Sequence, residues 1–315
     1  MIRLYAAATA ALLLSACGHA PRVQGLELRV REVPGGYLTG EVSGLERVAL
    51  LDNKEFVYSI AFSPGAEGVA FSRILGKKFQ LALWSLPSPP SLPGNGSGGV
   101  PQAIAEVPVN EYAFDVEAVA YSPDGKWVVT AGRDGAVRAF RSADGQRTAE
   151  SVIGEPLVSI AFVPGDLLAV GSARGLVTLL TWPDLRLAAQ KRVHSDEVRA
   201  LVALPQKRLI SGSWDKTIAV LAVEKERLDS GEAGMQPDAE PLREVKRHHF
   251  DSYVNDLTAD RAGRRLGVAF SAAKAERNRA VYDREKRGQD APFDLRDMAA
   301  IVDMESGAIV RRWTR

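Results

Sequence analysis

The chain of 315 residues is long enough for one large domain or two smaller ones. Its 40 Lys and Arg residues balance 39 Asp and Glu residues, which argues against a nucleic-acid-binding protein, because such a protein carries a basic excess. An apolar fraction of 46% excludes wholesale disorder, and abundant glycine with few amphipathic helical stretches favours an all-β protein.

The first 17 residues have the composition of an export signal. Arg3 supplies a positive start, Leu4 to Leu14 is apolar, and "LSAC" ends the run at Cys17. A run this short cannot span a bilayer as a mature helix. "LSAC" resembles the lipobox of bacterial lipoproteins, which implies that residues 1–16 are removed and that Cys17 is acylated. The alternative is an ordinary signal peptide with an incidental cysteine.

The residues after the signal bear on where the protein resides. Cys17 is the only cysteine of the chain, so we expect an exported domain without disulfides. Residues 17–25 are expected to form a short lipid-anchored tether. Gly18 stands where an Asp often marks retention in the inner membrane of lipoproteins, so the resemblance implies an outer-membrane anchor that faces the periplasm.

Three strand-like pieces precede the rest of the chain: Leu26–Val33, Gly36–Val42 and Arg47–Asp52. Together they could form most of one small sheet.

A repeat begins after these pieces. "IAFSPG" at residues 60–65 returns at 119–125 and 160–166, and more weakly at 201–207 and 256–263. In the third copy, four alternating or apolar runs are separated by turns: Val158–Phe162, Leu167–Ser172, Leu176–Trp182 and Leu187–Val193. Four short strands in about 40 residues predict one blade of a β-propeller.

Three insertions lengthen the repeat. Residues 86–101 and 224–241 are rich in Pro, Gly and Ser or in charge, and each follows a third strand. Residues 273–296 form a third, highly charged insertion with some helical propensity.

The segment "VHSDEVRALVALPQKRLISGSWDKTIAVL" at residues 193–221 resembles the WD40 repeat family. That family uses a buried hydrogen-bonded set of a loop His, a Ser or Thr in the second strand, an Asp in the next turn and a Trp in the third strand. The resemblance assigns the first three positions to His194, Ser211 and Asp215, with Leu221 at the Trp position. Other copies match less fully: Thr130, Asp134 and Phe140 in the second, Trp84 alone in the first, and Arg174 in place of the Asp in the third.

The repeats and the resemblance together predict the fold. We expect residues 26–315 to form an all-β, WD40-like propeller of four-stranded antiparallel blades. Five clear repeats plus an N-terminal partial blade favour six blades, and seven stay possible. Residues 308–315 are expected either as the outer strand of the fifth unit or as part of ring closure.

One rim of such a propeller gathers interface-type residues. Turns after second strands, and links into the next blade, lie on the same side, which we call the upper rim. Arg and Trp dominate binding energy in protein interfaces. Trp214 precedes the turn Asp and is expected to point outward. The predicted partner-binding residues are Arg73, Arg133, Trp214, Lys216, His248 and Tyr253, and the alternative is that they are merely exposed turn residues.

The pair His248–His249 does not predict a metal site, because adjacent side chains in an extended segment point to opposite faces. One of the two is expected to be the loop His of the fifth unit. No cofactor is predicted.

Three functions remain open from the sequence. The first is an interaction scaffold in an outer-membrane or envelope-spanning complex, with a protein partner and a lipid anchor but no nucleic acid or small-molecule substrate. The second is a lactonase-like or quinoprotein-like enzyme with Glu117, Arg199 and Asp256 near the central channel. The third is a periplasmic ligand-binding protein. No nucleophile elbow, phosphate loop or metalloprotease motif occurs in the chain, which favours the scaffold.

Overall fold

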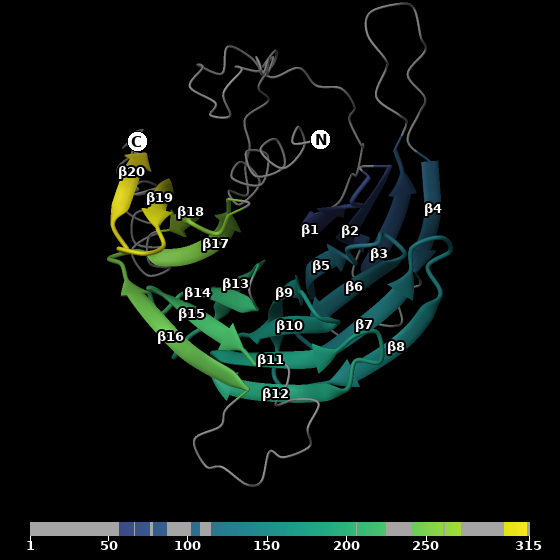
Figure 1. Ribbon diagram of the computed structural model, residues 1–315. Coiled ribbons are helices and arrows are strands. Elements are labelled where there is room, and N and C mark those ends of the chain that lie inside the picture. Colours follow the sequence, from purple (N-terminus) through teal and green to yellow (C-terminus); the bar gives the residue numbers. More distant parts are fainter. Residues whose placement is uncertain are drawn as a thin grey trace, which may run out of the picture. The chain divides into compact units, whose positions relative to one another are not determined.

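The computed structural model describes residues 57–65, 67–75, 78–86, 102–107, 115–205, 207–224, 241–260, 262–271 and 299–313. These residues form an all-β structure of five four-stranded antiparallel sheets, which are blades of a β-propeller (Figure 1). Within the described ranges no helix is long and apolar enough to cross a membrane.

In each sheet the strands lie in chain order, so each sheet is a simple meander. The first sheet contains β1 (Val57–Phe62), β2 (Gly68–Leu75), β3 (Lys78–Ser85) and β4 (Gln102–Val107). The second contains β5 (Val116–Tyr121), β6 (Trp127–Gly132), β7 (Ala136–Arg141) and β8 (Arg147–Val152). The third contains β9 (Leu157–Val163), β10 (Leu167–Ser172), β11 (Leu176–Thr181) and β12 (Leu187–Arg192). The fourth contains β13 (Val198–Leu204), β14 (Arg208–Ser213), β15 (Thr217–Val223) and β16 (Leu242–His249). The fifth contains β17 (Tyr253–Ala259), β18 (Arg265–Ser271), β19 (Ala299–Asp303) and β20 (Ile309–Trp313).

The strand sequences explain which strands are central. The middle strands β6, β7, β10 and β14 are buried along almost their whole length, and most of their side chains are apolar. The fourth strands β8 and β12 alternate between exposed and half-buried positions, as expected for strands at the outside of a blade.

The core lies between sheets. We call the face of a sheet that packs on the preceding sheet its leading face, and the opposite face its trailing face. Leu81 and Leu83 of the first sheet pack with Val128 and Phe140 of the second, and equivalent clusters join each later pair of neighbours. The first strands β1, β5, β9, β13 and β17 contact one another in series, and the fourth strands lie outermost (Figure 1).

Two β-bulges recur in all five sheets. Each first strand carries one extra residue near its start, and each fourth strand carries one where it faces the third strand. The inner bulge residues are Tyr58, Glu117, Val158, Arg199 and Asn255. A bulge re-aims a side chain out of the strand ladder, and the inner bulges do so on the upper rim.

The strand predictions agree closely with the structure. In the third unit the observed strands begin and end within one residue of the predicted runs. Of the two alternatives for the C-terminus, the outer strand is confirmed, because β20 pairs with β19. The three insertions fall between β3 and β4, between β15 and β16, and between β18 and β19. Nearly all of their residues, and all of residues 1–56 with Cys17 and the predicted N-terminal blade, lie outside the described residues.

Two leucines provide a matched test of the packing between sheets. Leu221 is fully buried between the third and fourth sheets, whereas Leu187 on β12 is 60% exposed. We expect Leu221→Ala to lower the free energy of unfolding by about 2–5 kcal/mol, because it leaves a cavity. Leu187→Ala should change it by no more than about 0.5 kcal/mol. Chemical denaturation of both variants measures the difference, and equal losses would contradict the assigned core.

Candidate functional site

A buried polar set closes the upper end of the fourth sheet. His194 lies in the link before β13, and its Nδ1 is 2.9 Å from Asp215 Oδ2 while its Nε2 is 2.8 Å from Ser211 Oγ. Thr217 Oγ1 donates to the other oxygen of Asp215 at 2.7 Å. The structure thus brings together the three residues that the sequence assigned to this set. They join a link, a strand and a turn, so they fix the shape of the rim.

Asp215 is held as a carboxylate by this arrangement. Burial opposes its charge, but hydrogen bonds from His194 and Thr217 hold the pKa of Asp215 well below its usual range. The backbone N–H groups of Ser195 and Thr217 also donate to it, at 3.1 and 3.0 Å. A charge with this many donors stabilises the turn and is not available for proton transfer.

The second sheet has different polar residues at the corresponding place. Asp134 accepts a hydrogen bond from the N–H of Ala136, and its second oxygen lies 2.7 Å from Arg138 Nη1. Arg138 also reaches Glu150 at 3.1 Å. Thr130 is fully buried and lies opposite Arg138 across the β6–β7 ladder. The turn Asp of this sheet is therefore paired with an arginine of the third strand β7, whereas the turn Asp of the fourth sheet is paired with a histidine of the link.

The third sheet uses a third combination. Glu155, in the link before β9, accepts a hydrogen bond from Ser172 Oγ at 2.6 Å. It also forms an ion pair with Arg192 at 2.7 Å. Arg174, which replaces the turn Asp, is exposed.

Two residues predicted for the exposed rim are buried instead. Arg73 donates to Gln80 at 2.8 Å and to Glu106 at 2.6 Å, and only 9% of the residue is accessible. His248 belongs to β16 and is buried against the β19–β20 turn, where Gly307 leaves no room for a Cβ beside its ring. Burial lowers the pKa of His248. The prediction that these two side chains are exposed for a partner is therefore wrong, and His248 is not the loop His of the fifth unit.

The upper rim carries a compact group of charged and aromatic side chains, which we call the rim cluster. Its members come from the second, fourth and fifth sheets: Glu117, Arg133, Glu197, Arg199, Trp214 and Asn255. Arg133 Nε lies 2.6 Å from Glu117 Oε1, and its Nη2 lies 3.7 Å from Glu197. Arg199 Nη1 lies 3.4 Å from Glu197 and 3.7 Å from Glu117. The carboxylates of Glu117 and Glu197 therefore alternate with the guanidinium groups of Arg133 and Arg199 in one network of ion pairs.

Trp214 extends the rim cluster to the fifth sheet. Its indole N–H donates to Asn255 Oδ1 at 2.8 Å, and the guanidinium carbon of Arg199 lies 5.3 Å from its ring centroid. The side chain is half-buried and is held by both of these contacts. Beside it, Lys216 Nζ lies 5.0 Å from the ring centroid of Tyr253. A partly accessible aromatic side chain that is held in this way is suited to contact with a partner.

Burial and neighbouring charges shift the pKa values of acidic side chains near the rim cluster. Burial and the charge of Glu117 raise the pKa of Asp115, while Arg133 opposes this shift. Burial also raises the pKa of Tyr58, and Asp115 and Glu117 add to the effect. Asp256 has an exposed side chain, yet surrounding protein atoms raise its pKa despite Arg199 nearby. The cluster thus holds its charges in fixed pairs, which suits recognition better than proton transfer.

Sequence reasoning missed Glu197 and Asn255. Glu197 is one residue beyond a turn-like "HSD" and has no distinguishing pattern. Asn255 could have been found, because it has the same place in β17 that Glu117 has in β5 and Arg199 in β13.

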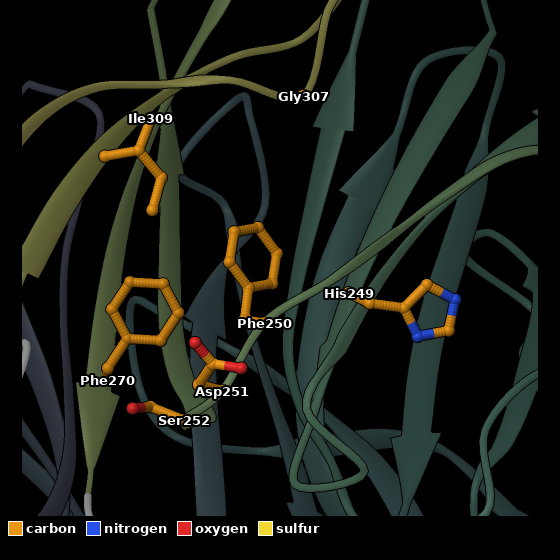
Figure 2. Close-up of a pocket in the computed structure, with 7 residues that line it drawn as sticks. All are labelled: His249, Phe250, Asp251, Ser252, Phe270, Gly307 and Ile309. Carbon is orange, nitrogen blue, oxygen red and sulfur yellow. The ribbon is translucent and has the colours of Figure 1, made fainter.

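A small cavity lies beside the fifth sheet (Figure 2). Its volume is about 130 Å³, and its lining residues are His249, Phe250, Asp251, Ser252, Phe270, Gly307 and Ile309. Phe250 and Phe270 approach with ring centroids 5.3 Å apart. This volume is below the roughly 300 Å³ at which ligand pockets begin. Among the described residues, no three His, Cys, Asp or Glu side chains are grouped to hold a metal ion.

Two segments of the chain match the family model described as "WD domain, G-beta repeat", at residues 108–141 and 187–220. These two segments are therefore similar to WD40 repeats. The second match includes His194, Ser211 and Asp215, and the first includes Thr130 and Asp134, so both lie where the turn carries an Asp. No curated protein matches the chain.

The buried set around Asp215 predicts a pH-dependent contribution to stability. Because the folded pKa of Asp215 is depressed, its contribution is complete above the unfolded pKa of about 3.9 and is lost as the pH falls toward the folded value. We expect Asp215→Asn to destabilise the protein at pH 7 by about 1–3 kcal/mol, and the gap to wild type to shrink below about pH 4. Denaturation curves at pH 7 and pH 3 measure this.

Asp184 provides the control. Its carboxylate is largely exposed and pairs with an exposed Arg186 at 3.2 Å. Asp184→Asn should change stability by no more than about 0.5 kcal/mol at either pH. A gap for Asp215→Asn that stays constant down to pH 3 would contradict the assignment.

Proposed function

We propose that this protein is a lipid-anchored scaffold of the bacterial cell envelope that binds a partner protein on its upper rim. The rim cluster is the observation that carries the proposal. WD40 propellers serve in general as platforms for protein–protein interaction, and the described sheets have that fold. The finer assignment to an outer-membrane or envelope-spanning complex rests on the N-terminal sequence.

The rim cluster has the properties of a pre-organised binding surface. Arg133 keeps 36% of its side chain accessible while its guanidinium is held by Glu117. Trp214 is held by Asn255 and Arg199. Ordering flexible side chains costs about 0.5–1.5 kcal/mol each on binding, and most of that cost is already met in the free protein. Rigid Trp and Arg residues are the types that dominate interface energy.

The same geometry argues for recognition over catalysis. Glu117 and Arg199, which could line an enzymatic channel, are engaged in ion pairs with each other and with Arg133 and Glu197. A catalytic carboxylate must be free to exchange a proton or to bind a metal ion. No observation in the described residues favours the enzyme or the small-ligand alternative more specifically.

The lipid anchor is supported by the sequence "LSAC" and by the single cysteine at position 17. Residues 18–25 would link Cys17 to the first predicted strand. Eight residues reach at most about 28 Å when fully extended, so the membrane and the propeller would stay close together.

Trp214 and Trp313 form a matched pair for testing the rim. Each stacks with an arginine, at 5.3 Å for Trp214 and 5.0 Å for Trp313, but Trp313 lies on the outer strand β20. We expect Trp214→Ala to weaken capture of the principal envelope partner at least about tenfold, because truncating a hot-spot residue costs about 2 kcal/mol or more. Quantitative affinity purification from membranes is the measurement.

Trp313→Ala is the control and should leave capture unchanged. Melting temperatures of both variants establish that the fold is intact. Equal recovery of the partner by both variants would refute the rim as the binding surface.

The anchor has a separate test. Metabolic labelling with a clickable fatty acid should mark the wild-type protein and leave Cys17→Ser unlabelled, since the chain has no other thiol to acylate. Wild-type protein that carries no label would count against lipidation, without bearing on the rim.

A further inference from the structure

A buried histidine lies where the outer strand of the fourth sheet meets the fifth sheet. His248 belongs to the trailing face of the fourth sheet, and 9% of the residue is accessible. Across the β15–β16 ladder it lies opposite Ile218, which is fully buried in the cluster that joins the two sheets. A Cβ at Gly307 would clash with the imidazole, so the ring packs directly against the backbone of the β19–β20 turn.

This environment favours the neutral form of the His248 ring. Its Nε2 atom is buried and has no hydrogen-bond partner among the described residues. A protonated imidazole carries an N–H on both nitrogens, so protonation would bury a donor that has no acceptor. Burial lowers the pKa of His248, and the charge of Lys246 adds to this shift, whereas a hydrogen bond with the backbone of Met304 opposes it.

The charged groups on the surrounding elements do not offset a proton on this ring. In the part of the chain that the structure describes, His248 forms no ion pair. Of the groups on its own strand, both Lys246 and His249 lower its pKa. The charged residues of the adjoining turns are Asp303 and Glu305 between β19 and β20, and Arg264 between β17 and β18.

Few buried contacts hold the β19–β20 turn in place. Met304 is half-buried, and its N–H donates to the carbonyl of Arg264 at 2.9 Å. The other residues that follow it, Glu305, Ser306 and Ala308, are exposed. A segment with few buried contacts opens more readily than the core of a sheet. The turn can therefore move away from His248 without unfolding the fifth sheet.

We propose that His248 is an acid-sensitive latch between the fourth and fifth sheets, which holds the β19–β20 turn when neutral and releases it when protonated. In the open form both ring nitrogens can donate to water, so protonation favours opening. The rim contacts of Trp214 with Asn255 and of Lys216 with Tyr253 join the same two sheets. An effect of acid on partner binding would rest on the proposed function, whereas the latch itself does not.

The size of the effect follows from the titration of imidazole. A solvent-exposed His has a pKa of about 6.5, so about nine-tenths of the released rings are protonated at pH 5.5. Because the pKa of His248 is lowered in the closed form, the contribution of the latch is complete above about pH 6.5 and is lost as the pH falls. The open population should rise by up to about tenfold between pH 7.5 and pH 5.5.

Hydrogen exchange of the full chain, followed by mass spectrometry, tests the latch. Exchange is compared at pH 7.5 and pH 5.5 after correction for the intrinsic pH dependence of the exchange rate. We expect wild-type peptides that span residues 299–309 to exchange up to about tenfold faster at pH 5.5. Peptides that span residues 167–181 of the third sheet should be unchanged. His248→Asn and His248→Gln, which stay uncharged at both pH values, should abolish the difference.

His249→Asn is the matched control, because the neighbouring ring is exposed and lies on the opposite face of β16. This variant should keep the wild-type response. A wild type without faster exchange in acid would overturn the proposal, as would a response that survives both replacements of His248. Unprotected N–H groups at residues 303–307 already at pH 7.5 would also overturn it, because then nothing holds the turn.

A second measurement needs no variant of His248. An NMR titration of the histidine side chains in the wild-type protein should give a midpoint below pH 6.5 for His248. A midpoint at or above pH 6.5 would contradict the latch, because the closed form would then bind the proton at least as well as the open form.

Discussion

Packing of each sheet against its neighbours is the interaction on which this structure depends. The second and third strands of every blade carry apolar side chains on both faces, so no blade can bury its own core. Phe140, Leu180 and Leu221 are each fully buried, and each packs against residues of the preceding sheet. Stability is then shared between neighbours in series, as in other repeat architectures, and an uncovered terminal face is a liability.

The polar residues at the upper rim vary more from blade to blade than the apolar core residues do. This rim has buried backbone and side-chain groups that need hydrogen-bond partners, but several residue combinations satisfy them. The fourth sheet uses His194 and Asp215, the second uses Asp134 and Arg138, and the third uses Glu155, Ser172 and Arg192. Because any combination that satisfies these hydrogen-bonding groups is sufficient, the polar residues can differ between repeats while the structure of the blade is retained. Two of the five copies consequently match the family model.

Much of the fold could be predicted from the sequence, because strand alternation and turn residues are local signals. The strands of the third unit were placed within one residue, and the residues of the fourth unit's polar set do meet. The errors concern non-local contacts. Arg73 was expected on the surface, but its partner Glu106 lies 33 residues away across two ladders, and no local pattern shows that they meet. His248 is buried by a turn of the next sheet. The hydrogen bond that holds Trp214 is also non-local, because Asn255 lies 41 residues further along.

The inner bulge explains how a degenerate repeat can acquire a specific surface. In each sheet one extra residue enters the first strand, and its side chain leaves the regular ladder at the upper rim. Since this residue makes no regular pair, its identity can change without disturbing the packing between sheets. The five blades indeed carry Tyr58, Glu117, Val158, Arg199 and Asn255 at this place. Core residues and recognition residues are thereby separated, and the rim cluster forms where three bulge residues meet the turns that carry Arg133 and Trp214 and the link that carries Glu197.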